Sequence, residues 1–102
     1  MTNLHAIAEQ LRQGETVSFR PRGHSMDPHI RSGQRVTVRP AGEGEMLRPG
    51  MIVLAAVRGK MYLHFVRAVH KNHDRVLIGP AHHVNGWTTR DKVAGIFVKA
   101  GR

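Results

Sequence analysis

The amino-acid sequence predicts a mainly β domain of about six or seven strands with one short helix at its N-terminus. Apolar residues recur at helical spacing near the N-terminus, within residues 3–13. After Gly14, apolar and polar residues alternate or form short apolar runs, and glycines and prolines separate these segments. A chain of 102 residues fits one domain, which we divide into a helical segment, 1–14, packed on a β domain, 15–102.

The helix is predicted over "NLHAIAEQLRQ", residues 3–13. Four apolar residues share one face of this helix: Leu4, Ile7, Ala8 and Leu11. Thr2 or Asn3 is expected to cap its N-terminus, and Gly14 is expected to end it. A single helix of this length does not form a helix-turn-helix, so the sequence predicts no built-in DNA-reading module of that kind.

Six later segments carry strand patterns. Some alternate apolar and polar residues, while one nearly continuous apolar run suits a strand covered on both faces. A turn at Arg58–Gly59 leads from this run into the next strand. In order, the segments are "TVSFRPRG" (16–23), "QRVTVRP" (34–40), "GMIVLAAV" (50–57), "KMYLHFVRAV" (60–69), "RVLIG" (75–79) and "KVAGIFVK" (92–99).

The chain is strongly basic, with 16 Lys and Arg against 7 Asp and Glu and a formal net charge of +9. This excess is expected to attract nucleic acid, acidic peptides or anionic membranes by non-specific electrostatic interaction. Specific recognition is not predicted, because the basic residues are scattered and Tyr62 and Trp87 do not alternate with a basic stripe. No cofactor or metal site is predicted, since there is no cysteine and the H-x-x-H spacing of His70 and His73 lies in a polar turn.

No segment is expected to span a membrane, because the longest apolar run, residues 51–57, is far shorter than about 18 residues. The first fifteen residues lack the apolar stretch of a secretory signal. These features and the lack of cysteine favour a cytoplasmic protein. They do not predict an oligomeric state.

The segment "GHSMDPHI", residues 23–30, is the first candidate for chemistry. Pro28 disfavours helical backbone at Asp27, and Gly23 permits a tight backbone passage. Ser25 is therefore expected at a bend or at the end of a strand, where its side chain can reach a partner. A serine hydroxyl becomes an effective nucleophile only when a neighbouring base takes its proton.

The chain has eight histidines as candidates for that base. His24 adjoins Ser25, but adjacent side chains of an extended chain point to opposite faces. His29 follows Pro28 and is expected to turn away. Four others lie in polar turns: His70, His73, His82 and His83. His64 differs, because it lies in the apolar and aromatic segment "MYLHFVRAV" and needs a hydrogen-bond partner there, either as the base or as a structural core residue.

The features around Ser25 occur in a specific order along residues 14–100. A Gly-x-Ser-Met-x-Pro motif is formed by Gly23, Ser25, Met26 and Pro28. Glycines open the next two strands at Gly33 and Gly50, and a late glycine, Gly79, precedes the closing "VAGIFV" strand. His64 stands 39 residues after Ser25. This series resembles the signal peptidase and LexA-type serine peptidases, and His64 falls at the base position of their histidine-type members.

The resemblance implies a small β-rich serine peptidase in which Ser25 attacks a peptide carbonyl and His64 accepts the serine proton. It also implies that the Ser25 backbone N–H, with a further donor near Gly23, holds the oxyanion. Met26 and Pro28 are then expected to border a groove for an extended peptide or protein substrate.

The chain departs from the family pattern at four positions, one of which follows the base: His64 precedes Phe65 and Val66 in place of the usual Arg-Val, and Arg67 comes third. Gln34 and Met51 replace the aspartates that usually follow the two strand-opening glycines, and Pro80 replaces the aspartate after the late glycine. Acidic residues in that late region orient the base in histidine-type members, so Asn85 or Asp91 is left for that role. The alternative prediction is a catalytically degenerate relative that binds peptide, protein or nucleic acid.

Overall fold

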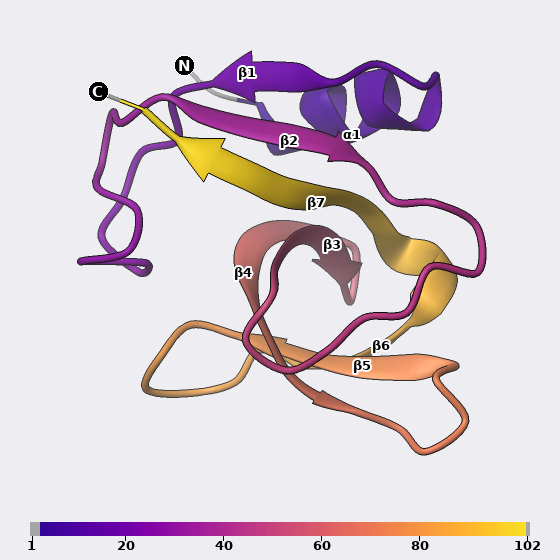
Figure 1. Cartoon of the computed structure of the whole chain (residues 1–102). Coiled ribbons are helices and arrows are strands. Elements are labelled where there is room, and N and C mark those ends of the chain that lie inside the picture. The colour runs from indigo at the N-terminus through magenta and orange to yellow at the C-terminus, as the bar shows by residue number, and fades with distance from the viewer. Residues whose placement is uncertain (1–2, 102) are drawn as a thin grey trace.

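The computed structural model describes residues 3–101 and confirms a mainly β fold, with seven antiparallel strands in one sheet and one short helix (Figure 1). The strand order across the sheet is β1-β2-β7-β3-β4-β5-β6. The elements are α1 (Leu4–Arg12), β1 (Val17–Phe19), β2 (Val36–Pro40), β3 (Ile52–Val57), β4 (Lys60–Val69), β5 (Arg75–Gly79), β6 (Gly86–Thr89), the 3₁₀ turn η1 (Arg90–Lys92) and β7 (Val93–Ala100).

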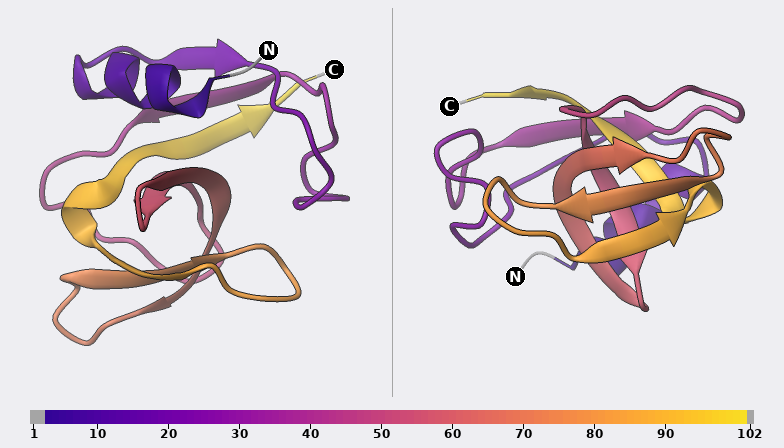
Figure 2. Two further views of the ribbon diagram at one scale, coloured as in Figure 1. Left: turned by 180° about the vertical axis from the view of Figure 1, so that it is seen from behind. Right: turned by 90° about the horizontal axis from the view of Figure 1, so that it is seen from below.

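The helix α1 begins and ends close to the predicted residues. The Asn3 side chain accepts a hydrogen bond from the Ala6 N–H at 3.2 Å, which confirms Asn3 as the cap. Thr2, the other candidate, lies outside the described residues. The helix ends before Gly14, whose φ of +92° favours glycine. Figure 2 shows α1 beside β1 and β2, so the helix covers one face at this end of the sheet.

Two clusters of buried apolar residues form the core. Leu54 of β3 belongs to the cluster beneath α1, while its neighbours Val53 and Ala55 belong to the second cluster. Adjacent strand residues point to opposite faces, so β3 is buried on both, as its apolar run predicts. A Cβ at Gly95 of β7 would lie 2.7 Å from the Cδ1 of Leu11, so this glycine lets the helix pack closely on the sheet.

The sequence patterns located every strand except β6, Gly86–Thr89. This strand is four residues long, forms the edge of the sheet and pairs only with β5. Trp87 in its middle is 47% exposed, so β6 has no apolar face of the usual strand pattern. The first predicted strand, 16–23, is also shorter than expected, because β1 ends at Phe19 and the chain then turns away from the sheet.

Two loops that are far apart in the sequence project on the same side of the molecule (Figures 1 and 2). One loop, residues 20–35, joins β1 to β2, and the other, residues 80–85, joins β5 to β6. The curled β4 lies between them in the sheet order. The fold therefore brings Ser25, in the first loop, and Asn85, in the second, to the same end of the sheet.

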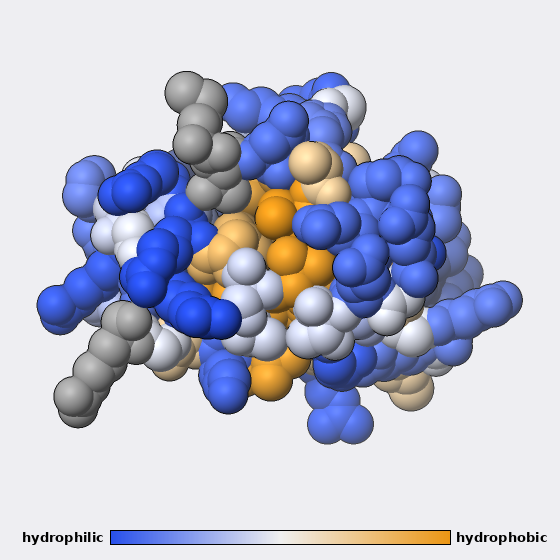
Figure 3. Space-filling view, turned by 90° about the horizontal axis from the view of Figure 1, so that it is seen from above, coloured by the Kyte–Doolittle hydropathy of each residue, from blue (hydrophilic) through white to orange (hydrophobic). Residues whose placement is uncertain are grey.

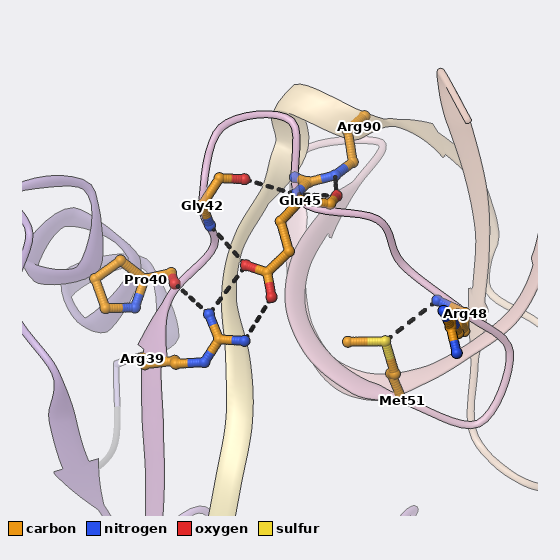
Figure 4. Close-up of polar contacts among 7 residues, drawn as sticks. All are labelled: Arg39, Pro40, Gly42, Glu45, Arg48, Met51 and Arg90. Atoms are coloured by element: carbon orange, nitrogen blue, oxygen red, sulfur yellow. Dashed lines mark hydrogen bonds and ion pairs between the residues drawn. The ribbon is translucent and has the colours of Figure 1, made fainter. Parts of the chain in front are cut away.

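A hydrogen-bonded cluster holds the loop that follows β2 (Figure 4). The Arg39 guanidinium donates two hydrogen bonds to the Glu45 carboxylate, and the Gly42 N–H donates a third at 2.9 Å. Arg90 donates from the other side to the backbone carbonyl oxygens of Gly42 and Glu45. The hydrogen bond from Arg39, followed by that from Gly42, lowers the pKa of Glu45 to about 2.

The residues that follow Gly33 and Gly50, Gln34 and Met51, both bind backbone groups. The Gln34 Oε1 accepts a hydrogen bond from the Arg31 N–H at 2.9 Å, and its amide nitrogen donates to the Gly101 carbonyl oxygen at 3.0 Å. The Met51 sulfur accepts from the Arg48 N–H at 3.2 Å (Figure 4). These contacts stabilise the two turns without a carboxylate.

The surface above α1 and β1 is only partly polar. Figure 3 shows apolar surface at the centre of this face, bordered by hydrophilic side chains. The apolar residues of these elements that remain partly exposed are Leu4, Ile7, Val17 and Phe19. Within residues 3–101, no helix has the length and apolar character needed to cross a bilayer.

Candidate functional site

Ser25 and His64 lie in direct contact. The Ser25 Oγ is 3.0 Å from the Nε2 of His64, and the Nδ1 of the same ring is 2.6 Å from the Oδ1 of Asn85. An amide oxygen only accepts hydrogen bonds, so this contact assigns the imidazole proton to Nδ1. The Nε2 of the neutral ring then carries the free electron pair and faces the serine hydroxyl. The arrangement is a Ser–His–Asn chain of three side chains.

Ser25 is exposed on a turn whose neighbours are anchored. Met26 and Ile30 are 5% and 3% exposed and pack in the core beneath α1. The Ile30 N–H donates to the Met26 carbonyl oxygen at 3.0 Å, so the backbone turns directly after the serine. The two buried side chains fix the turn from below, which leaves the Ser25 hydroxyl on its outer side.

The base of the Ser25 loop is closed by hydrogen bonds between its two arms. The Gly33 N–H donates to the Pro21 carbonyl oxygen at 2.7 Å, and the Arg20 guanidinium donates to the Gly33 carbonyl oxygen at 3.0 Å. The Gly23 N–H donates to the Ser32 hydroxyl at 3.1 Å. The loop is therefore a cross-linked unit that positions the serine.

His64 is the only buried polar residue in the described part of the chain, with 7% of its surface exposed. It lies in the middle of β4, opposite Val53 of β3, and its ring stacks on that of Tyr62 at a centroid distance of 5.2 Å. Burial lowers the pKa of His64, the hydrogen bond from its ring to Asn85 opposes this effect, and the nearby His83 adds to it. The ring is therefore neutral over a wider pH range than a free imidazole.

The loop that carries Asn85 is held tightly against β5. A Cβ on Gly79 would lie 2.5 Å from the His83 carbonyl oxygen and 2.6 Å from the Val84 Cα, so only glycine permits this close approach. The Asn85 N–H donates to the Ile78 carbonyl oxygen at 2.7 Å. These contacts fix the backbone that presents the Asn85 side chain.

Arg67 of β4 also binds the loop that carries Asn85. Its Nη1 donates to the Pro80 carbonyl oxygen at 2.6 Å and to the His83 carbonyl oxygen at 3.0 Å. Arg67 thus lies three residues after His64 in the same strand and binds the segment that leads to Asn85. Its guanidinium contacts the Asn85 loop and not the side chains of Ser25 or His64.

The structure separates the other sequence candidates from this site. Asp91 is exposed in η1, where the Thr89 hydroxyl lowers its pKa, and no contact joins it to His64 among the described residues. Pro28 borders a different hollow. His24 points outward and pairs with Asp27 at 3.0 Å. Of the two orienting candidates, the structure therefore brings only Asn85 to His64.

An open cavity of about 500 Å³ surrounds the serine and the histidine. Gly23, predicted near the oxyanion, and Met26, predicted for the groove, both line it. Its charged lining was not foreseen: the three basic side chains on its wall are Arg22, Arg31 and Lys60. These residues are dispersed in the sequence, and only the fold of the first loop against β4 brings them together.

One edge of β4 is unpaired beside the cavity. Residues 60–64 pair with β3 on one side, but pairing with β5 begins only at Phe65. No strand among residues 3–101 covers the other side of this segment. Alternate backbone N–H and C=O groups of a strand point to each side, so this edge presents free hydrogen-bonding groups next to His64.

The amide groups near Ser25 differ in their hydrogen bonds. The Gly23 N–H is already bound to Ser32, so it is not a free donor for an oxyanion. Within residues 3–101, the Ser25 N–H donates to no acceptor. It is therefore the available backbone donor at the serine.

No group of three or more metal-ligating side chains gathers within the described residues 3–101. Comparison with protein-family models finds none that matches the chain, and comparison with curated proteins finds no match either.

Proposed function

We propose that the protein is a serine peptidase that cleaves an extended peptide segment with a Ser25–His64 pair, oriented by Asn85. The observation that carries this proposal is the continuous hydrogen-bonded chain from the Ser25 Oγ through both ring nitrogens of His64 to the Asn85 Oδ1. An asparagine orients the base in known Cys–His–Asn proteases, so a neutral amide is chemically adequate for this role. The lack of cysteine in the chain accords with a cytoplasmic location, which we propose with it.

The reaction follows from the position of each proton. The Ser25 Oγ attacks a peptide carbonyl carbon while the His64 Nε2 takes the hydroxyl proton. The tetrahedral intermediate then breaks its C–N bond, and the imidazolium gives that proton to the leaving amine. Water attacks the resulting serine ester, its proton passes to His64 and then to the Ser25 Oγ, and the acid product leaves. The enzyme is regenerated with no other reactant.

The free Ser25 N–H is the backbone donor that we assign to the oxyanion of the tetrahedral intermediate. The unpaired edge at residues 60–64 supplies the main-chain hydrogen bonds for an extended substrate. Such strand addition needs no particular side chain in the substrate, and adjacent pockets then provide selectivity. Both features lie beside the Ser–His contact.

A fluorophosphonate probe tests the proposal, because it forms a covalent bond only with an activated serine. We expect mass spectrometry to place the label on Ser25 in the wild-type protein. Ser25→Ala and His64→Ala should each abolish labelling and peptide cleavage. Ser18→Ala, which removes an exposed serine of β1 that bonds only to Thr37, is the matched control and should label normally.

Failure to label Ser25, or equal labelling of the wild type and His64→Ala, would contradict a peptidase. The second result would show that the histidine does not activate the serine. The remaining function would then be that of a non-catalytic peptide-binding relative, and the alternative of nucleic-acid attraction through the +9 charge would also remain.

A further inference from the structure

The wall of the Ser25–His64 cavity is cationic. Arg22 and Arg31 flank the serine in the first loop, and Lys60 begins the unpaired segment of β4. The imidazoles of His64 and His83 also line the cavity, whereas no carboxylate lines it among the described residues. A concave surface of one charge concentrates ligands of the opposite charge.

These three cations are not neutralised by the protein itself. Within residues 3–101, the side chains of Arg22 and Arg31 make no ion pair. Asp27 borders the hollow beside Arg31, but its carboxylate pairs with His24. The Lys60 ammonium lies 5.6 Å from the centre of the Tyr62 ring, and none of the acidic side chains among residues 3–101 pairs with it. All three are exposed and available to a ligand.

We infer that the substrate is an acidic peptide, with aspartate or glutamate side chains that bind Arg22, Arg31 and Lys60 on either side of the scissile bond. This inference rests on the proposed peptidase function and adds its substrate class. A peptide is favoured over nucleic acid because the cations lie next to a free strand edge, which pairs with a peptide backbone.

The position of Lys60 fixes one of the acidic residues more closely. Lys60, Tyr62 and His64 alternate along β4, so they point to the same side of the strand. A strand rises about 3.3 Å per residue, so Lys60 lies about 13 Å from His64. A substrate strand beside β4 places its reacting carbonyl near His64, so the residue opposite Lys60 is about four positions from the scissile bond.

Binding and cleavage are measured separately to test the inference. Alanine-based peptides with a neutral fluorophore carry one glutamate at successive positions, each with a glutamine analogue. Binding to the Ser25→Ala variant is followed by fluorescence anisotropy, and cleavage is followed with the wild-type protein. The best glutamate peptide should bind about 5- to 10-fold more tightly than its glutamine analogue, and this preference should shrink at high salt.

The basic residues are then removed singly. Lys60→Gln should remove most of the preference at the position about four residues from the cut and leave other positions unchanged. Arg22→Gln and Arg31→Gln should reduce the preference nearer the cut. Lys71→Gln removes the same charge from the turn after β4, away from the cavity lining, and should change none of these values.

The outcomes separate the inference from the proposed function. Cleavage of glutamate and glutamine peptides at equal kcat/KM, with equal binding, would overturn the acidic preference and leave the peptidase intact. Tight glutamate-dependent binding without cleavage would support recognition of an acidic peptide by this cavity and would contradict the peptidase. A single-stranded oligonucleotide that binds more tightly than every glutamate peptide, and loses this binding in Lys60→Gln, would overturn the inference in favour of nucleic acid.

Discussion

The Asn85 Oδ1 accepts a hydrogen bond from the Nδ1 of His64 at 2.6 Å, and this contact determines which ring nitrogen faces Ser25. The donor must carry the ring proton, so the opposite nitrogen is the basic one. In the proposed mechanism, the asparagine performs the orienting part of a triad without adding a negative charge. Substitutions at Asn85 can therefore separate the effect of the hydrogen-bond acceptor from the effect of a negative charge.

Asn85→Ala and Asn85→Asp are expected to act in different ways. The alanine variant loses the acceptor for Nδ1–H, so the ring is free to rotate or change tautomer, and kcat/KM should fall about 100-fold. The aspartate variant keeps the acceptor and adds a negative charge, which raises the pKa of His64 above its wild-type value. The pH profile of kcat/KM measures both effects, and its acid limb should move to higher pH only in Asn85→Asp. An unchanged profile in both variants would show that Asn85 does not orient the base.

The wild-type pH profile should have its acid limb below the ordinary imidazole pKa of 6.5, because burial lowers the pKa of His64. Only the neutral ring accepts the serine proton, so activity persists to lower pH than for a solvent-exposed histidine. The measurement is kcat/KM against pH, with the histidine titration followed by NMR in Ser25→Ala. An acid limb above pH 6.5 would contradict the effect of burial.

The same pKa shift also affects stability. Because the pKa of His64 is lower in the folded protein, the unfolded chain binds a proton at a pH where the folded protein does not. The contribution of His64 to the free energy of unfolding is therefore complete above the unfolded pKa of 6.5. It is lost as the pH falls through the folded pKa. Urea unfolding at several pH values should show this loss. His64→Gln should remove that component of the pH dependence, whereas His5→Gln, an exposed helix histidine, should retain it.

Gly79→Ala is expected to destabilise the protein and displace Asn85. The added Cβ would meet the backbone of His83 and Val84 at 2.5 and 2.6 Å, so the loop must move away from β5. We expect a loss of about 1 to 3 kcal/mol in the free energy of unfolding and a fall in kcat. Gly101→Ala is the control, since its Cβ would have 4.0 Å to the nearest atom. Equal stability of the two variants in urea unfolding would contradict the close approach.

Glu45→Gln should remove a pH-dependent part of stability. The Glu45 carboxyl has its pKa lowered from 4.5 to about 2 by Arg39 and the Gly42 N–H, so its stabilisation is present above pH 4.5 and is lost as pH falls through about 2. The variant should lose about 1 to 2 kcal/mol at neutral pH, and its difference from wild type should vanish near pH 2. Glu43→Gln, in the same loop and exposed, should match the wild type at each pH. A difference that persists at pH 2 would show that the carboxylate charge is not the cause.

The strands were predictable wherever apolar and polar residues alternate or where several apolar residues follow one another. β3 and β4 follow their patterns and the turn at Arg58–Gly59, where both residues have positive φ. β6 was missed because an exposed four-residue edge strand buries too little apolar surface to show a period. Its place is determined by pairing with β5, which the local sequence does not encode.

The candidate site was predictable only in part, because some of its residues are brought together by tertiary contacts. Ser25 and His64 stand out by their local surroundings, so the sequence could name both. Asn85 is brought to His64 by the close approach at Gly79 and by the hydrogen bonds of Arg67, which depend on tertiary contacts. The sequence therefore left Asn85 and Asp91 as equal candidates, and it gave no signal for Arg67.

The place of β7 within the sheet has a consequence for how the polypeptide folds. β7 lies between β2 and β3, so among residues 3–101 it is the only strand that pairs the two-stranded group β1–β2 with the four-stranded group β3–β6. While residues 93–100 remain inside the ribosome, the nascent chain exposes two open strand edges that have no proper partner. The sheet can therefore form completely only after β7 has left the ribosome. Before that, the nascent chain is most prone to aggregate through its open strand edges.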